Sequence, residues 1–113
     1  MRKIDTKKAH YLGLDQRLAP RSDVYCRLPL ALPDGRQGIC TCLNISADGL
    51  LMRFEQMLEP DDTVVLNLPV IGRTTAKVVW SLGGKTGVQF ETTIAAEDYL
   101  PMLRAMGARG DVN

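Results

Sequence analysis

Hydrophobic and polar residues alternate along six short segments of this chain. In the first segment every second residue is apolar, as in a strand with one buried face: Val24, Cys26, Leu28, Leu30 and Leu32. The same alternation predicts strands at about residues 39–45, 50–54, 63–69, 73–81 and 87–91. Clusters of turn-forming residues separate these segments at nearly regular intervals. The pattern therefore predicts a mainly β domain of six short strands, folded as a small sandwich or barrel.

The sequence PDG at 33–35 predicts a hairpin between the first two strands, because proline presets φ and glycine supplies positive φ. With Asp-Gly as a two-residue loop, Leu30 faces Ile39 and the apolar positions of the two strands coincide. This register leaves Cys40 and Cys42 on the other face of the hairpin. We expect both thiols to pack there under another segment.

The last segment, residues 93–107, changes period, and its apolar residues recur three apart: Leu100, Leu103 and Met106. This spacing predicts a helix, with Thr93 as its N-cap and Gly107 as its end. Pro101 lies inside the predicted helix. Either the helix kinks there, or a second helix begins with Pro101 in its first turn.

Length and charge set limits on function. The chain has 113 residues, 45 % of them hydrophobic, which suits one globular domain. Residues 1–27 carry seven basic and three acidic side chains, a charge of +4, whereas the remainder carries seven basic and ten acidic, a charge of −3. A local positive segment on a protein of net charge +1 suits a small anion better than a nucleic acid polymer.

Several other classes of protein are disfavoured. No apolar run approaches the roughly 20 residues that cross a bilayer, and the N-terminus lacks the apolar stretch of a signal peptide, so we expect a cytoplasmic protein without membrane insertion. The chain has three cysteines and one histidine without zinc-type spacing, so we expect no disulfide and no metal site. No catalytic set can be assembled from a single histidine, and we expect no enzyme activity. A redox role of Cys26, Cys40 and Cys42 stays open.

Two short motifs carry candidate chemistry. The sequence RLAPR places Arg17 and Arg21 four residues apart, but Pro20 makes a continuous helix there unfavourable, so both belong to a loop before the first strand. The sequence NISADG at 44–49 predicts a turn, in which Asn and Ser side chains bond the backbone and the glycine supplies a left-handed conformation. By itself the second motif is an ordinary hairpin turn.

Taken together, R-x-x-x-R at 17–21 and N-x-S-x-x-G at 44–49 resemble the motif pair of the PilZ domain family. The segments VVW at 78–80 and GVQF at 87–90 extend the resemblance over about residues 16–105. It implies a small six-stranded antiparallel β-barrel with a C-terminal helix, and binding of cyclic di-GMP, a messenger with two guanines and two phosphodiesters. We expect a flexible basic segment at 1–15, a PilZ-like domain at 16–107 and a frayed C-terminus at 108–113.

Carried over position by position, the resemblance implies a ligand site formed by Arg17, Arg21, Asn44, Ser46 and Gly49. A guanidinium can donate two parallel hydrogen bonds to guanine or clamp a phosphate, so the arginine pair suits this ligand. Asn44 stands where many members have aspartate, and an amide accepts through one oxygen only, which predicts lower affinity.

Neighbouring residues refine this expectation. Gln16, just before the first arginine, adds no cation, which favours one bound ligand molecule over a stacked pair. Trp80 and Gln89 could line the site. We expect Trp80 instead in the core, on one face with Ala76 and Val78, and Gln89 in solvent.

The resulting hypothesis is a cyclic di-GMP receptor without a cofactor, whose N-terminal arginine loop becomes ordered on binding and which signals to a partner protein in trans. The main alternative is a PilZ-fold interaction module that does not bind the nucleotide. A small barrel for single-stranded nucleic acid is disfavoured by the aromatic content of 5 %, because such proteins stack bases on aromatic side chains. A thiol-based enzyme ranks last.

Overall fold

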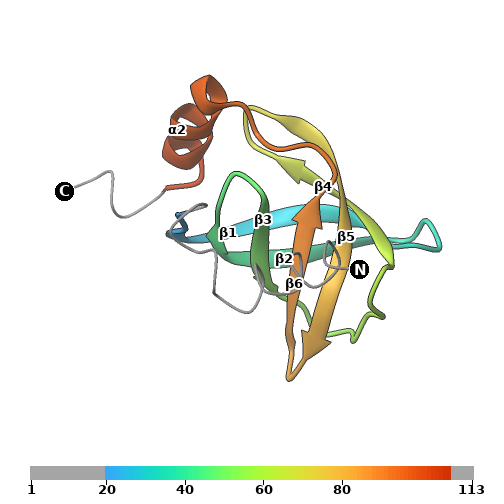
Figure 1. Cartoon of the computed structure of the whole chain (residues 1–113). Coiled ribbons are helices and arrows are strands. Elements are labelled where there is room, and N and C mark those ends of the chain that lie inside the picture. The colour runs from blue at the N-terminus through green and yellow to red at the C-terminus, as the bar shows by residue number, and fades with distance from the viewer. Residues whose placement is uncertain (1–19, 108–113) are drawn as a thin grey trace, which may run out of the picture.

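The structure is a computed structural model that describes residues 20–107, and its architecture is a closed antiparallel β-barrel followed by one helix (Figure 1). The elements are β1 (Ser22–Ala31), β2 (Gln37–Ile45), β3 (Gly49–Arg53), β4 (Thr63–Leu68), β5 (Gly72–Leu82), β6 (Lys85–Phe90) and α2 (Ala96–Ala105). Around the barrel the strand order is β1-β2-β3-β6-β5-β4. The expected six-stranded barrel with a C-terminal helix is confirmed, whereas the expected segments 1–15 and 108–113 lie outside the described residues.

Alternate strand residues fill the barrel. The largest side chains with almost no exposure come from all six strands and from α2, among them Leu28, Ile45, Met52, Leu66, Val78, Val88 and Met102. Removing one such side chain from water contributes roughly 1.5–3 kcal/mol. Burial of the alternating positions is therefore the main force that holds the strands in a closed sheet.

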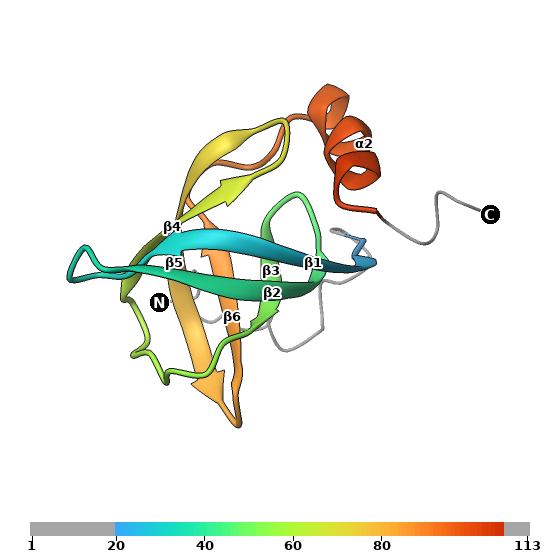
Figure 2. The ribbon, with the colours of Figure 1, turned by 180° about the vertical axis from the view of Figure 1, so that it is seen from behind.

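The barrel closes through a short ladder. β1 and β4 share two residue pairs, Leu30 with Leu66 and Ala31 with Val65, and the first part of β1 runs apart from β4. In Figures 1 and 2, α2 lies across this end of the barrel, beside the beginning of β1 and the β2–β3 turn. Two of its residues, Met102 and Leu103, and its C-cap residue Met106 complete the core.

The β1–β2 hairpin differs from the expected register by one residue. Leu30 pairs with Gly38 instead of Ile39, because the loop contains three residues, 33–35. The N–H of Leu32 donates to the carbonyl of Arg36 at 2.8 Å, and Gly35 has φ 91°. A loop of this length commonly ends in a residue of positive φ that forms a bulge.

This one-residue shift reverses the faces of β2. Cys40 and Cys42 are 1 % and 0 % exposed and belong to the core, whereas Ile39 is 50 % exposed. Because side chains alternate with period two, a slip of one residue exchanges the two faces of a strand. The prediction that both thiols lie on the face opposite Leu28 and Leu30 is therefore wrong, although both are buried as expected.

Helix α2 is one continuous element that contains Pro101, so the alternative of a second helix beginning there is wrong. The N-cap is Ala95, which makes no side-chain cap bond, and the Thr93 hydroxyl instead donates to Asp48 Oδ1 at 3.0 Å. The predicted Thr93 cap is therefore wrong, because the helix starts too far along the chain. Gly107 has φ 74° and ends the helix as predicted. Within residues 20–107, no helix has the length and apolarity needed to cross a bilayer.

Tyr99 anchors α2 to the barrel. Its hydroxyl donates to the Ile45 carbonyl at 2.9 Å and lies 3.3 Å from the Ser22 hydroxyl. Burial raises the pKa of Tyr99 above its ordinary value, so the hydroxyl stays a neutral donor at physiological pH. This contact joins the helix to β2 one residue after Asn44.

We predict that Tyr99→Phe lowers the free energy of unfolding by about 1 kcal/mol, because it leaves the Ile45 carbonyl without this donor. The raised pKa adds an alkaline signature: the stabilisation is complete below pH about 10, where an unfolded tyrosine ionises, and decreases as the pH rises further. Urea unfolding at pH 7 and pH 11 measures both effects. The matched control is Tyr25→Phe, since Tyr25 is 69 % exposed and makes no hydrogen bond to any residue of the described range. Equal losses in the two variants would contradict the anchoring role.

Candidate functional site

The β2–β3 turn is built around a buried serine. Ser46 is 4 % exposed, and its main-chain N–H donates to the Gly49 carbonyl at 2.8 Å. Its hydroxyl accepts from the Asp48 N–H at 3.1 Å and donates to the same Gly49 carbonyl at 3.4 Å. The serine of the second motif therefore holds the shape of the turn, as a side-chain-to-backbone turn motif does.

Three bonds attach this turn to the last residue of β6 and to the segment that follows it. The Asp48 carbonyl accepts from the Phe90 N–H at 2.8 Å, and the Ala47 carbonyl accepts from the Ile94 N–H at 2.9 Å. The third is the bond from the Thr93 hydroxyl to the Asp48 carboxylate. Both ends of the turn also belong to strands, so the motif is held from two directions and presents a rigid edge.

Gly49 has a different role from the predicted one. It is buried, is the first residue of β3 and pairs with Gln89, and it is absent from the glycines of positive φ. The prediction of a left-handed Gly49 is therefore wrong. Its contribution to the turn is the carbonyl that receives both bonds from Ser46.

The structure brings one residue of the first motif onto the second. Arg21 is exposed and directly precedes β1, and its Nη1 donates to Asn44 Oδ1 at 3.3 Å across 23 residues of sequence. The strand pairing of Asp23 with Asn44 brings these segments together. The other predicted arginine, Arg17, lies outside the described residues. Of the five predicted site residues, the structure therefore gathers four around one corner of the barrel: Arg21, Asn44, Ser46 and Gly49.

Trp80, which the sequence pattern predicts in the core, lies in the same row of the outer face as Asn44. The ladder pairs Asn44 with Leu51, Leu51 with Gly87 and Gly87 with Trp80. Trp80 is 37 % exposed, because a register shift between Val78 and Trp80 turns its side chain outward. The prediction that it shares a face with Val78 in the core is therefore wrong.

Gly87 makes room for the Trp80 ring. A Cβ atom built at this glycine would lie 2.5 Å from Trp80 Nε1 and 2.9 Å from Cε2, so the indole covers the backbone directly. The pairing of Trp80 with the glycine of GVQF indicates an indole packed over the strand, but this pairing can be recognised only when the register of β5 and β6 is known. Gln89, expected in solvent, is half-buried beside Gly49.

Cations border this row. Arg27, Arg53 and Lys85 are exposed, and the ladder aligns them through Thr41 in one line across four strands. None of the three forms an ion pair with any residue between 20 and 107. The outer face beside Asn44 and Trp80 therefore has a positive potential that attracts anions.

The three cysteine thiols lack the lowered pKa of a reactive cysteine. Burial raises the pKa of Cys40 to about 12, and it also raises the pKa of Cys42 and Cys26, so all three stay protonated at neutral pH. The Cys42 thiol donates to the Asn44 carbonyl at 3.4 Å and so supports the site from within. Across the part of the chain that the structure describes, no cluster of three or more histidine, cysteine or acidic side chains could hold a metal ion.

Comparison of the chain with known proteins identifies a family. The model of the PilZ domain family matches residues 15–105, which is more than half of the chain and includes both motifs. This family is one of cyclic di-GMP-binding modules. No curated protein matches the chain.

We predict that Gly87→Ala lowers the free energy of unfolding by about 1–3 kcal/mol, because the new methyl group forces the indole off the strand. Urea unfolding followed by the fluorescence of Trp80, the single tryptophan, measures the effect. Gly38→Ala is the matched control, since a Cβ there meets Leu30 and Phe54 at an ordinary 3.5 Å. We expect this control to change stability by less than about 1 kcal/mol. A larger loss in the control than in Gly87→Ala would contradict the close approach of Trp80.

Proposed function

The chain belongs to the PilZ domain family, and from this premise we propose that it is a receptor that binds cyclic di-GMP and signals to a partner protein in trans. The observation that carries the proposal is the contact of Arg21 with Asn44, in which residues of the two family motifs meet although they are far apart in sequence. The ligand in this proposal binds at this corner of the barrel, against Arg21, Asn44 and the adjoining turn, with Arg17 as the second cation.

The side chains at the corner suit the chemistry of the ligand. A guanidinium donates two parallel bonds to O6 and N7 of guanine, or binds a phosphodiester. The bond between Arg21 and Asn44 is long and exposed, so its loss to a ligand costs little. The indole of Trp80 offers a face for stacking a purine in the same row as Asn44, and base stacking on an aromatic side chain contributes about 1–3 kcal/mol.

The rigid turn and the surrounding charge support the same proposal. Because Ser46 is committed to bonds within the turn, its contribution is a preformed backbone shape, which reduces the ordering cost of binding. Arg27, Arg53 and Lys85, which form no ion pair with any residue between 20 and 107, favour the approach of a dianionic ligand. Ordering of the arginine loop on binding belongs to the proposal, and most of that loop lies outside the described residues.

In this proposal the protein is a binding module without enzyme activity and without a cofactor. It acts in the cytoplasm, where the free thiols Cys26, Cys40 and Cys42 remain reduced. Its effector is a protein that reads the surface formed by the bound state.

A second candidate is a PilZ-fold interaction module that does not bind the nucleotide. One observation favours it: Ser46 is 4 % exposed, and its hydroxyl already donates one hydrogen bond and accepts another within the turn. On this alternative the protein acts through protein contacts without binding the nucleotide, and replacement of Arg17 or Arg21 leaves its function unchanged.

Calorimetric titration with cyclic di-GMP separates the two candidates. We expect saturable binding in the micromolar range, and we expect Arg21→Ala to weaken it by roughly tenfold or more, because a charge-assisted bond contributes about 1.5–3 kcal/mol. The matched control is Arg53→Ala, an exposed arginine two strands away, for which we expect less than about a threefold change because its contribution is long-range only. Arg17→Ala tests the second cation in the same assay.

Absence of heat and of any amide shift with cyclic di-GMP in the folded protein would reject the receptor and leave the interaction module. An equal loss in Arg21→Ala and Arg53→Ala would mean that general charge, and not the motif corner, binds the ligand.

A further inference from the structure

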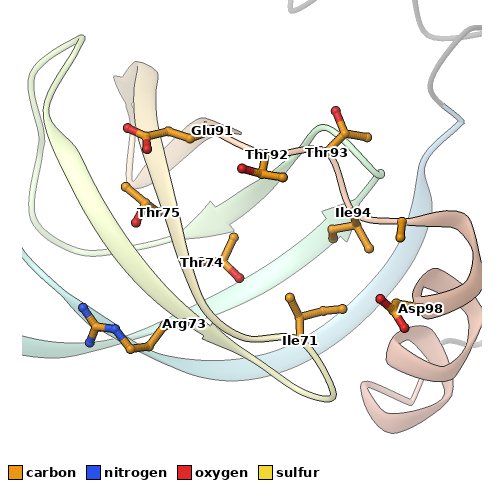
Figure 3. A pocket seen from close by; sticks show the side chains of 10 residues that line it. Ile71, Arg73, Thr74, Thr75, Glu91, Thr92, Thr93, Ile94 and Asp98 are labelled. Atoms are coloured by element: carbon orange, nitrogen blue, oxygen red, sulfur yellow. The ribbon is translucent and has the colours of Figure 1, made fainter.

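A hollow lies beside the linker from β6 to α2, the segment that bonds the β2–β3 turn at residues 46–49. It has a volume of about 440 Å³, within the range of small-ligand sites, and lies between the first residues of β5 and the linker from β6 to α2. Figure 3 shows Thr74 and Thr75 of β5 on one side, Thr92 and Ile94 of the linker on the other, and Asp98 of α2 at one end. We call this hollow the β5 groove.

The register leaves a strand edge unpaired in the β5 groove. The Val78 N–H donates to Asp62, which precedes β4, so even-numbered residues of β5 direct their main-chain groups toward β4. The Thr75 carbonyl accepts from the Glu91 N–H, so odd-numbered residues direct theirs toward the β6 side. The ladder with β6 ends at Ala76 and Phe90.

Beyond that point the chain leaves β5. The N–H and carbonyl of Arg73 and the N–H of Thr75 therefore face the β5 groove, and no residue between 20 and 107 bonds them there. The closed barrel pairs most of its strand edges, and α2 lies beside the unpaired first part of β1, so this short stretch is a place where an extended chain could add main-chain hydrogen bonds.

We propose that the β5 groove binds an extended segment of a partner protein, which adds as a short strand to the edge of β5 at Arg73–Thr75. Unpaired donors and acceptors in line along an edge match an extended backbone better than a compact small molecule. The lining is rich in hydroxyls, with Thr74, Thr75, Thr92 and Thr93, so it accepts small and polar side chains from that segment.

Charge narrows the chemistry of the segment. Glu91 and Asp98 bring two exposed carboxylates to the β5 groove, whereas Arg73 brings one guanidinium. The net negative charge selects a segment with a lysine or arginine, and this also separates the β5 groove from the cationic face with Arg53 and Lys85.

The linker connects the β5 groove with the motif turn. Thr93 and Ile94 line the groove, and the same two residues bond Asp48 and Ala47. A bound segment that displaces the linker therefore disturbs the hydrogen bonds that hold the turn containing Ser46. The groove assignment itself does not require nucleotide binding.

Selection of random heptapeptides displayed on phage, with the full chain as the target, tests the proposal. We expect enrichment of peptides that carry a basic residue, and we expect the synthetic peptides to shift the amide signals of Arg73, Thr75 and residues 92–95. Arg73→Pro removes one edge N–H without touching the β4 ladder, and we expect it to weaken binding roughly three- to tenfold. Arg73→Ala keeps this N–H and is the matched control, for which we expect no loss of affinity for basic peptides, because it removes only a positive charge from the groove.

A second variant keeps the test decisive if Arg73→Pro does not fold. Asp98→Lys reverses one charge of the β5 groove, and we expect it to shift selection from basic toward acidic peptides. The proposal is overturned if no peptide is enriched, if the enriched peptides shift the face with Arg53 and Lys85, or if folded Arg73→Pro binds them as tightly as Arg73→Ala does. It is equally overturned if a second copy of the chain, or residues of its own termini, give the nuclear Overhauser contacts to the Arg73 amide. Peptide binding in a protein that ignores cyclic di-GMP would support the β5 groove and reject only the receptor function.

Discussion

Closure of the barrel between β1 and β4 is the constraint on which the other features depend. Two residue pairs join these strands, so the first part of β1 lacks a neighbour on one side and the end of the barrel stays open. Helix α2 and its C-cap residue Met106 fill this opening with three buried side chains, and the bond from Tyr99 to the Ile45 carbonyl fixes the helix. Asn44 and Ser46 flank that carbonyl in sequence. The motif corner is therefore held at the place where barrel and helix meet.

The two halves of the candidate site are stabilised in different ways. The turn at 46–49 consists of buried or half-buried groups whose polar atoms bond each other and the linker, so its shape exists before any ligand binds. Arg21 is an exposed side chain with one long hydrogen bond. In the proposed complex, the preformed turn orients the ligand at little ordering cost, and Arg21 supplies a charge-assisted hydrogen bond.

Much of the fold could be predicted from local patterns, and the errors share one cause. Alternation of apolar residues located all six strands and the helical segment, because burial of one face is a property of neighbouring residues. The face of Cys40 was wrong because one additional loop residue shifts a whole ladder, and the face of Trp80 was wrong because a bulge adds one residue between it and Val78. Thr93 was assigned to the helix as a cap, whereas its partner Asp48 lies 45 positions away.

By itself, the sequence determined the number of strands, the helix at the end, the motif pair and the family to which both point. The tertiary structure alone decided that Arg21 reaches Asn44, that Trp80 lies over Gly87 in the same row, and that the edge of β5 at Arg73 pairs with no residue of the described range. The reason is physical. Periodicity follows from interactions within a few residues, but contacts across strands depend on loop lengths and bulges, each of which moves every later residue of a ladder together.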